Sequence, residues 1–295
     1  MTGTDLGITT ATATGPALPH PRLSINQATI KYAPLEEALR LSVDARLESI
    51  GLWREPLAEV GLDRALRMVE DSGLRVSSLC RGGFFTAIEG PERRTAIDEN
   101  RRAIAEAAAL GAPALVLVAG GLPERSRDLV GARERVRDAI GELVGEARDE
   151  GVTLAIEPLH PMYASDRAVV STLGQALDIA EQFTPDAVGV VVDTFHVWWD
   201  PELLSLIARA GARGYIASYQ VCDWATPLPA DVLLARHYPG DGVIDFASIT
   251  EAVQTAGYVG DVEVEIFNQH IWDSPSADVI ARTVASFNAT IAVHL

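Results

Sequence analysis

Four oxygen-bearing side chains end four consecutive apolar runs in the second half of the chain. They are Glu157, Asp193, Gln220 and Glu265. If the runs are strands of one barrel, their carboxyl ends meet at one mouth, where three carboxylates would repel one another unless a cation lay between them. All-oxygen ligands favour Mn²⁺ or Mg²⁺, although such sites also accept Co²⁺ or Zn²⁺. The pattern therefore predicts one divalent metal ion held by these four residues, with Mn²⁺ as the first choice.

A divalent ion flanked by two glutamates suits proton transfer next to a carbonyl group. The ion would polarise the carbonyl and stabilise an enediolate, while Glu157 and Glu265 would remove the carbon-bound proton and return it. Return to the other face of the same carbon is epimerisation, and return to the neighbouring carbon is aldose–ketose isomerisation. Departure of a hydroxyl group instead would make the same site a dehydratase or lyase. A non-catalytic sugar-binding barrel is a second alternative, but it would not need both glutamates.

Further polar and aromatic residues are candidates for substrate contact. His196 follows Asp193 by three residues, so we expect it to hold a substrate oxygen. The other candidates lie at the same end of the predicted strands: Trp198, His160, Arg81 and His237. For each, a structural role as a loop anchor or core side chain is the alternative. Glu263, two residues before Glu265, points to the same side of its strand one layer deeper and could orient a neighbouring ligand.

The segments that must position these residues alternate between strand and helix. Residues 188–192 form a β-branched run without polar alternation, which is typical of a strand buried on both faces of a parallel sheet. Eight predicted strands, each followed by a helical segment, cover residues 23–30, 49–54, 76–83, 114–121, 152–159, 188–197, 215–223 and 261–267. Eight such units predict an α/β fold, the (β/α)8 TIM barrel. A doubly wound open sheet is the alternative, but no GxGxxG follows the first strand and no GxxxxGK[ST] occurs.

Composition and connections predict the domain organisation. Residues 1–19, rich in Thr, Ala, Gly and Pro, are expected to be a flexible tail, which leaves residues 20–295 as a single catalytic barrel. The tail resembles neither a signal peptide nor a membrane span, so we expect a cytoplasmic protein with no membrane partner. The longest predicted connection, residues 224–245, follows the seventh strand and is expected to act as a lid over the barrel mouth.

The charge of the chain restricts its partners. It has 24 basic and 41 acidic residues, and the resulting net charge of −17 repels phosphate backbones and anionic lipid, so we expect no nucleic-acid partner. Lys31 is the only lysine, and any Schiff-base mechanism would have to use it. Cys80 and Cys222 lack the close spacing of a disulfide or zinc framework and are expected to be buried thiols.

Several motifs resemble those of the sugar phosphate isomerase/epimerase superfamily. The matching segments are IEP at 156–158, VVDTFHVWW at 191–199, YQVCDW at 219–224, GDGVIDF at 240–246 and GYVGDVEVEIF at 257–267. These xylose-isomerase-like TIM barrels include D-tagatose 3-epimerase, hydroxypyruvate isomerase, inosose isomerases and dehydratases, and endonuclease IV. The resemblance spans residues 22–290, and its motifs are specific for the superfamily but only weakly specific for substrate. It implies a small polyhydroxylated keto substrate, such as a ketose, keto-inositol or hydroxypyruvate, and a homodimer or homotetramer.

The resemblance also carries residue roles and some departures from them. Glu157, Asp193, Gln220 and Glu265 match the four metal ligands, and His196 matches the substrate-contacting histidine of a DxxH pattern. Gln220 replaces the histidine of many epimerases and is similar to hydroxypyruvate isomerases. The arginine that 3-epimerases place shortly after this ligand is absent, with Thr226 in the matching region, and Tyr163 stands in place of a second acid on the fifth loop. The trinuclear zinc site of the nuclease branch needs several histidines, some at the ends of the third and fourth strands, where this chain reads CRGG and VAGG, and the chain has only six histidines in all.

Overall fold

A closed barrel of eight parallel strands forms the centre of the protein. The computed structural model describes residues 18–295. The strands follow one another around the barrel in the order β1-β2-β3-β4-β5-β6-β7-β10, and β10 pairs with β1 to close it. Their bounds are β1 (Leu23–Asn26), β2 (Ser49–Trp53), β3 (Arg75–Gly83), β4 (Ala114–Val118), β5 (Thr153–Glu157), β6 (Val188–Asp193), β7 (Ile216–Val221) and β10 (Val262–Val264). The prediction of a TIM barrel is confirmed.

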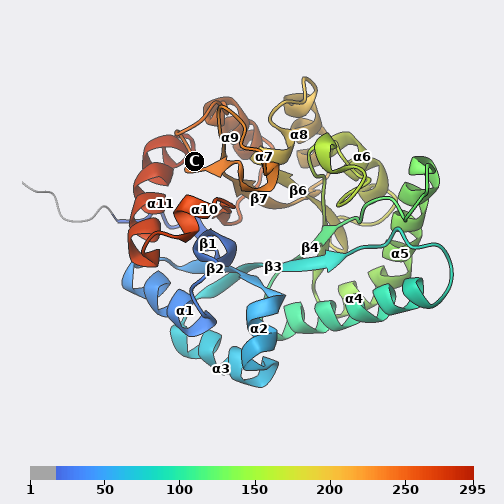
Figure 1. Cartoon of the computed structure of the whole chain (residues 1–295), viewed down its shortest axis with the longest axis horizontal. Helices are drawn as coiled ribbons and strands as arrows, with labels where there is room; N and C mark the ends of the chain where they lie inside the picture. Colours follow the sequence, from blue (N-terminus) through green and yellow to red (C-terminus); the bar gives the residue numbers. More distant parts are fainter. Residues whose placement is uncertain (1–17) are drawn as a thin grey trace, which may run out of the picture.

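The connecting helices form a ring around the strands, and the last helix lies beside the first elements of the chain (Figure 1). They are α1 (Leu35–Asp44), α2 (Arg54–Val60), α3 (Leu62–Ser72), α4 (Pro91–Ala109), α5 (Leu129–Asp149), α6 (Leu173–Ala180), α7 (Thr194–Val197), α8 (Leu203–Gly211), α9 (Phe246–Thr255), α10 (Gln269–Trp272) and α11 (Ser276–Thr290). Among residues 18–295, no helix combines the length and apolarity that a membrane crossing requires. The tail predicted at 1–19 lies almost wholly outside the described residues.

Burial explains why the apolar runs form strands. All six residues of β6 are buried, because helices cover its outer face and side chains fill the barrel interior. The run stops at Asp193, whose carboxylate accepts a hydrogen bond from the Phe195 backbone N–H and so caps the short helix α7. A buried apolar strand therefore ends at a carboxylate held at the mouth of the barrel.

Two predicted elements differ from the structure, and single residues explain how. The single helical segment expected after the second strand is two helices, because Gly61, with a φ of +81°, ends α2 before α3 begins. The long connection 224–245 is not structureless, because β8 (Asp223–Trp224) pairs antiparallel with β9 (Arg236–His237). Asp223 fastens this connection by accepting hydrogen bonds from the backbone N–H groups of Gly240 and Gly242 at 2.9 and 2.8 Å.

Candidate active site

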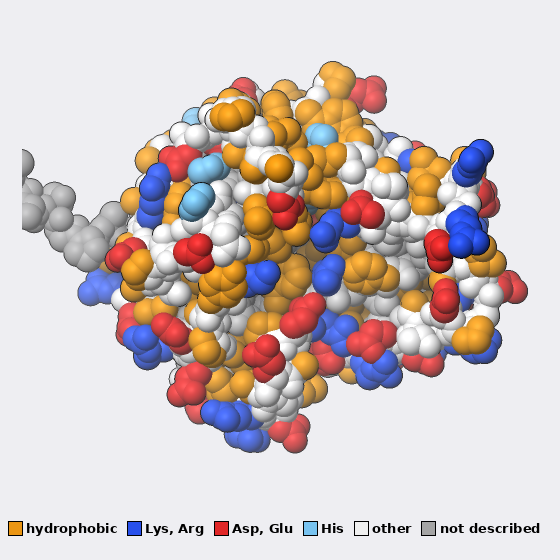
Figure 2. Space-filling model, viewed as in Figure 1, with side chains coloured by type: hydrophobic (Ala, Val, Ile, Leu, Met, Phe, Trp, Pro, Cys, Tyr) orange, Lys and Arg blue, Asp and Glu red, His pale blue; other side chains and the backbone are white. Residues whose placement is uncertain are grey.

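A cavity of about 670 Å³ opens at the carboxyl ends of the barrel strands. We call it the mouth cavity. In Figure 2, basic side chains lie around a hollow near the middle of the face shown. Its lining includes Glu157, Glu265, His196 and Arg236, and the connection 224–245 also contributes Leu233. A second cavity, of about 710 Å³, lies between α2 and α4; we place the chemistry in the mouth cavity because the predicted catalytic glutamates line it.

Three carboxylates lie close together here, and of these Glu157 and Glu265 line the cavity, whereas Asp193 does not. Glu157 ends β5, Asp193 ends β6, and Glu265 follows β10, and all three are almost fully buried. Burial, reinforced by the neighbouring carboxylates Asp193 and Glu265, raises the pKa of Glu157 well above its usual value. Burial also raises the pKa of Glu265 to about 7, although the Arg236 guanidinium opposes that shift. The cluster is therefore short of positive charge, which is the condition that a bound cation would relieve.

Arg236 brings one positive charge into this cluster. Its Nη1 lies 2.7 Å from Glu265 Oε2 and 3.2 Å from Asp193 Oδ2. The guanidinium is buried between the rings of Phe195 and Phe267, 4.7 and 4.9 Å from their centroids. Burial lowers its pKa, but the nearby carboxylates outweigh that effect and raise it overall, so the side chain is cationic. The strand pair β8–β9 positions this residue, and its place in the site was not predicted.

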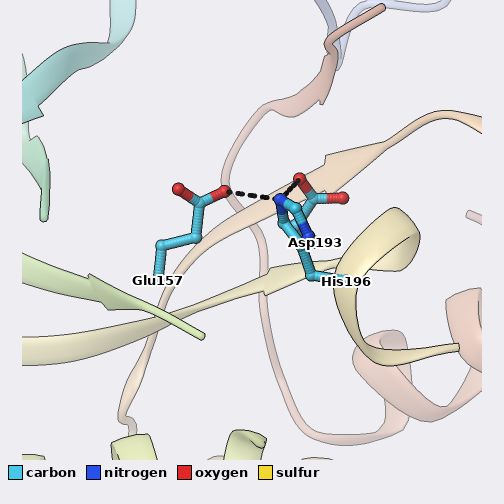
Figure 3. A group of neighbouring side chains, drawn as sticks. All are labelled: Glu157, Asp193 and His196. Carbon is cyan, nitrogen blue, oxygen red and sulfur yellow. Dashed lines mark ion pairs between the residues drawn. The ribbon is translucent and has the colours of Figure 1, made fainter. Parts of the chain in front are cut away.

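His196 faces Glu157 and Asp193 from the first turn after β6 (Figure 3). Its Nε2 lies 4.0 Å from Glu157 Oε1 and 3.7 Å from Asp193 Oδ2, within a group that could hold a metal ion. However, the backbone N–H of His160 donates to Nδ1 at 3.1 Å. Burial, with help from Arg236, lowers the pKa of His196 well below its usual value, so the ring is neutral.

Both ring nitrogens of His196 face an N–H donor, and a neutral ring can accept from only one, so we assign the tautomer from the less movable donor. A neutral imidazole has one acceptor nitrogen, and the fixed backbone N–H of His160 uses Nδ1 as that acceptor, which places the ring proton on Nε2. Arg236 Nη2, 3.1 Å from Nε2, is then a close contact rather than a hydrogen bond. An Nε2–H group donates and cannot ligate a metal, so the geometry favours the predicted substrate contact over a ligand role.

Gln220 is the fourth predicted ligand. It lies on β7 with its Nε2 3.2 Å from Glu263 Oε1, while its own Oε1 is buried without a hydrogen-bond partner among the described residues. A buried carbonyl oxygen of this kind is normally satisfied. Together with the three carboxylates, this unpartnered oxygen fits the all-oxygen donor set that a divalent ion such as Mn²⁺ requires.

Of the other residues predicted to contact the substrate, only one lines the mouth cavity. Arg81 lines the mouth cavity, and the Cζ atom of its guanidinium lies 5.5 Å from the centroid of the Trp53 ring. Trp198, His160 and His237 do not line this cavity. Trp198 and His160 both pack against Trp224, with ring centroids 5.4 and 5.1 Å apart, and thus form the wall behind the site.

Besides Arg81 and Arg236, whose Nε atoms are buried without a partner, two further cavity-lining residues carry buried polar atoms that no described residue satisfies. These atoms are Gln27 Nε2 and Tyr163 Oη. Tyr163 also packs edge-on against His196, with ring centroids 5.9 Å apart. Neither residue was predicted as a substrate contact, although the resemblance placed Tyr163 where relatives have an acid. Only the folded geometry shows that these atoms lack partners.

Comparison with known proteins agrees with the fold. Residues 39–289 match the family of the xylose isomerase-like TIM barrel. The chain belongs to this family.

Individual relatives are similar over different lengths. An inosose isomerase from Halalkalibacterium halodurans is 25% identical over 77% of this chain and 78% of its own. An L-ribulose 3-epimerase from Mesorhizobium japonicum is 27% identical over 53% of this chain, which spans only 48% of that protein. A crystal structure of a Sinorhizobium meliloti 1021 protein superposes with a TM-score of 0.89 at 48% identity, covering 92% of this chain and 98% of the other. The structure of the IolI protein with a zinc atom has a TM-score of 0.78 at 21% identity, covering 93% and 99%, and so shares the fold.

Proposed function

We propose that this chain is a divalent-metal-dependent isomerase or epimerase of a small polyhydroxylated keto compound. The observation that carries the proposal is the pair of buried glutamates, Glu157 and Glu265, which line one cavity and both have raised pKa values. Two such carboxyl groups are suited to accepting and donating a proton near neutral pH. The similarity to an inosose isomerase and an L-ribulose 3-epimerase supports the reaction class.

In this proposal Glu157, Asp193, Gln220 and Glu265 hold the ion. When bound, the ion supplies a positive charge that polarises a substrate carbonyl and makes the neighbouring C–H acidic. Mn²⁺ remains the preferred metal because Gln220 offers an amide oxygen in place of a nitrogen ligand. Asp193 is suited to a fixed role, since one of its oxygens already caps α7.

Glu157 and Glu265 carry out the proton transfer. Glu157 ends β5 and Glu265 follows β10, the first and last of four adjacent strands, so they approach the cavity from different sides. One carboxylate oxygen removes the proton from the carbon next to the carbonyl, and the other carboxyl group returns a proton to the opposite face or to the neighbouring carbon. The carbon to which the proton returns decides between epimerisation and isomerisation.

The remaining residues orient the substrate and limit access of water. The Nε2–H of His196 donates to a substrate oxygen, and Tyr163 Oη and Gln27 Nε2 offer further hydrogen bonds from the cavity wall. The cavity of about 670 Å³ lies within the range of typical small-molecule sites. The connection 224–245 narrows the mouth by placing Leu233 and Arg236 in its lining.

Solvent-deuterium exchange tests this function. Full-length protein loaded with Mn²⁺ is incubated in D₂O with inosose, L-ribulose or hydroxypyruvate, and deuterium at carbon is followed by NMR. Incorporation that is lost in Glu157→Gln and Glu265→Gln supports an isomerase or epimerase. A product lacking a hydroxyl group would indicate a lyase instead. If the metal is bound but none of the three compounds takes up deuterium or changes, a sugar-binding barrel is favoured.

A further inference from the structure

We propose that Glu263 is a positioning residue that fixes the amide of Gln220 so that its carbonyl oxygen is presented to the metal ion. This inference rests on the metal-dependent function proposed above. Glu263 is 1% exposed and lies on β10, beneath the mouth cavity. Its carboxylate is not needed by the proton-transfer steps, yet it is buried in the centre of the barrel and requires an explanation.

The carboxylate of Glu263 is surrounded by hydrogen-bond donors from three other strands. Asn26 Nδ2 donates to Oε1 at 2.6 Å, and the hydroxyl groups of Ser77 and Ser78 donate to Oε2 at 2.5 and 2.9 Å. Gln220 Nε2 donates to Oε1 at 3.2 Å. Glu263 therefore acts as an acceptor toward every one of these neighbours.

The acceptor role of Glu263 determines which way the Gln220 amide faces. The NH₂ group must face Glu263, because a carbonyl oxygen there would oppose another oxygen. Gln220 has Glu263 as its register neighbour on β10 and Asp193 as its register neighbour on β6. With the NH₂ group directed to β10, Oε1 is left for the side of Asp193, buried and without a partner among the described residues.

The surroundings also hold Glu263 itself in place. A Cβ atom at Gly51 would lie 2.4 Å from the Cδ of Glu263, so the barrel keeps a glycine where the carboxylate must fit. Asn26 is fixed in turn, since its Oδ1 accepts hydrogen bonds from the Ala28 backbone N–H at 2.9 Å and from Trp53 Nε1 at 2.7 Å. Because Trp53 lines the mouth cavity, these contacts connect the cavity wall to the proposed ligand.

A double-mutant cycle on metal affinity tests the inference without any substrate. Mn²⁺ binding to full-length, metal-stripped protein is measured by titration calorimetry for the wild type, Glu263→Gln, Gln220→Ala and the double variant. Glutamine at 263 has nearly the same shape but presents an N–H group, so the amide of Gln220 is no longer forced into one orientation. We expect Glu263→Gln to weaken Mn²⁺ binding by about 10–100-fold. We expect no further weakening when it is added to Gln220→Ala, because both changes remove the same oxygen.

Two further variants separate positioning from general stability. Thr250→Val removes an equally buried hydroxyl that bonds Tyr219 Oη at 2.8 Å, and it should leave Mn²⁺ affinity unchanged. Gly51→Ala places a methyl group against Glu263 without altering the carboxylate, and it should weaken Mn²⁺ binding in the same direction; it serves as the test if Glu263→Gln does not fold.

Two results would overturn the inference. One is an unaltered Mn²⁺ affinity in folded Glu263→Gln. The other is a double variant whose loss of Mn²⁺ binding free energy equals the sum of the losses in Glu263→Gln and Gln220→Ala. A wild type that binds no Mn²⁺ would overturn the proposed metal dependence together with this inference, whereas normal wild-type binding with either of the first two results overturns the positioning role alone.

Discussion

The guanidinium of Arg236 lies 2.7 Å from Glu265 and also contacts Asp193, so one buried cation bridges two proposed metal ligands. With all three carboxyl groups ionised, Glu157, Asp193 and Glu265 together with the one guanidinium carry a formal charge of −3 + 1 = −2. A divalent ion would bring this cluster to neutrality. The relationship explains how so many acids can be buried together, and it suggests that Arg236 reduces the repulsion while the metal is absent.

Replacing Arg236 should therefore destabilise the metal-free protein. We expect Arg236→Gln to cost about 3–5 kcal/mol in the free energy of unfolding, because the change leaves buried carboxylates without their counter-ion. Saturating Mn²⁺ should recover much of this loss. The matched control is Arg209→Gln, whose exposed ion pairs with Asp178 and Glu181 predict a loss of about 0–1 kcal/mol. Denaturant unfolding with EDTA or Mn²⁺ measures both, and equal losses in the two variants would count against the role of Arg236.

The two glutamates should be indispensable for turnover. We expect Glu157→Gln and Glu265→Gln each to lower kcat by about 10²–10⁴-fold or more, since each removes a proton-transfer group, and each should also weaken Mn²⁺ binding. Steady-state kinetics on the substrate found by deuterium exchange, with metal content measured in parallel, provides the check. Full activity in either variant would refute the assignment.

His196 should act on the substrate and not on the metal. Because we assign its ring proton to Nε2, His196→Ala is expected to lower kcat/KM by about 10²-fold while leaving Mn²⁺ stoichiometry intact. Elemental analysis of the purified variant decides the matter. Loss of the metal would show instead that His196 is a ligand.

Tyr163 should contribute to activity more than to stability. Its buried hydroxyl has no partner among the described residues, so Tyr163→Phe is expected to leave the free energy of unfolding unchanged or slightly higher while turnover falls about 10-fold. Tyr215→Phe is the matched control, because the Tyr215 hydroxyl donates to the Phe183 carbonyl at 2.8 Å. That control should lose about 1 kcal/mol of stability with normal turnover. Normal turnover in Tyr163→Phe, together with a loss of stability, would make Tyr163 a structural residue.

The metal-free protein should lose stability as pH rises. Burial raises the pKa of Glu265 to about 7 from an ordinary value near 4.5, so the protonated folded form is favoured. The stability due to Glu265 is complete below about pH 4.5 and is lost as pH rises toward 7. Mn²⁺ affinity should increase over the same range, because the ion competes with protons for the carboxylate. Thermal unfolding in EDTA between pH 5 and 8 should show a weaker pH dependence in Glu265→Gln; an identical dependence would contradict this reasoning.

The sequence predicted the barrel and the acids at its strand ends because both depend on local pattern. A buried parallel strand such as β6 has a continuous apolar run, and Asp193 marks its end without ambiguity. Consecutive strands are neighbours in a barrel, so Glu157, Gln220 and Glu265 come from strands on the same side of it. Whether these residues bind metal stays a prediction, as do the oligomeric state and cellular location.

The arrangement around the acids could not be predicted in the same way. Arg236 lies sixteen residues after Gln220, on a connection whose strand pair had no clear pattern, so its arrival between Asp193 and Glu265 depends on tertiary folding. The unpartnered hydroxyl of Tyr163 likewise exists only in the folded cavity. His237 was expected at the mouth, but Arg236, the other residue of β9, lines the cavity instead.

A crystal of the full-length protein soaked in Mn²⁺ tests the central claim most directly. Anomalous diffraction at the manganese edge should show one strong peak at the base of the mouth cavity, with oxygen atoms of Glu157, Asp193, Gln220 and Glu265 around it. The absence of a peak there, or a peak bound by His196 and not by Gln220, would contradict the account.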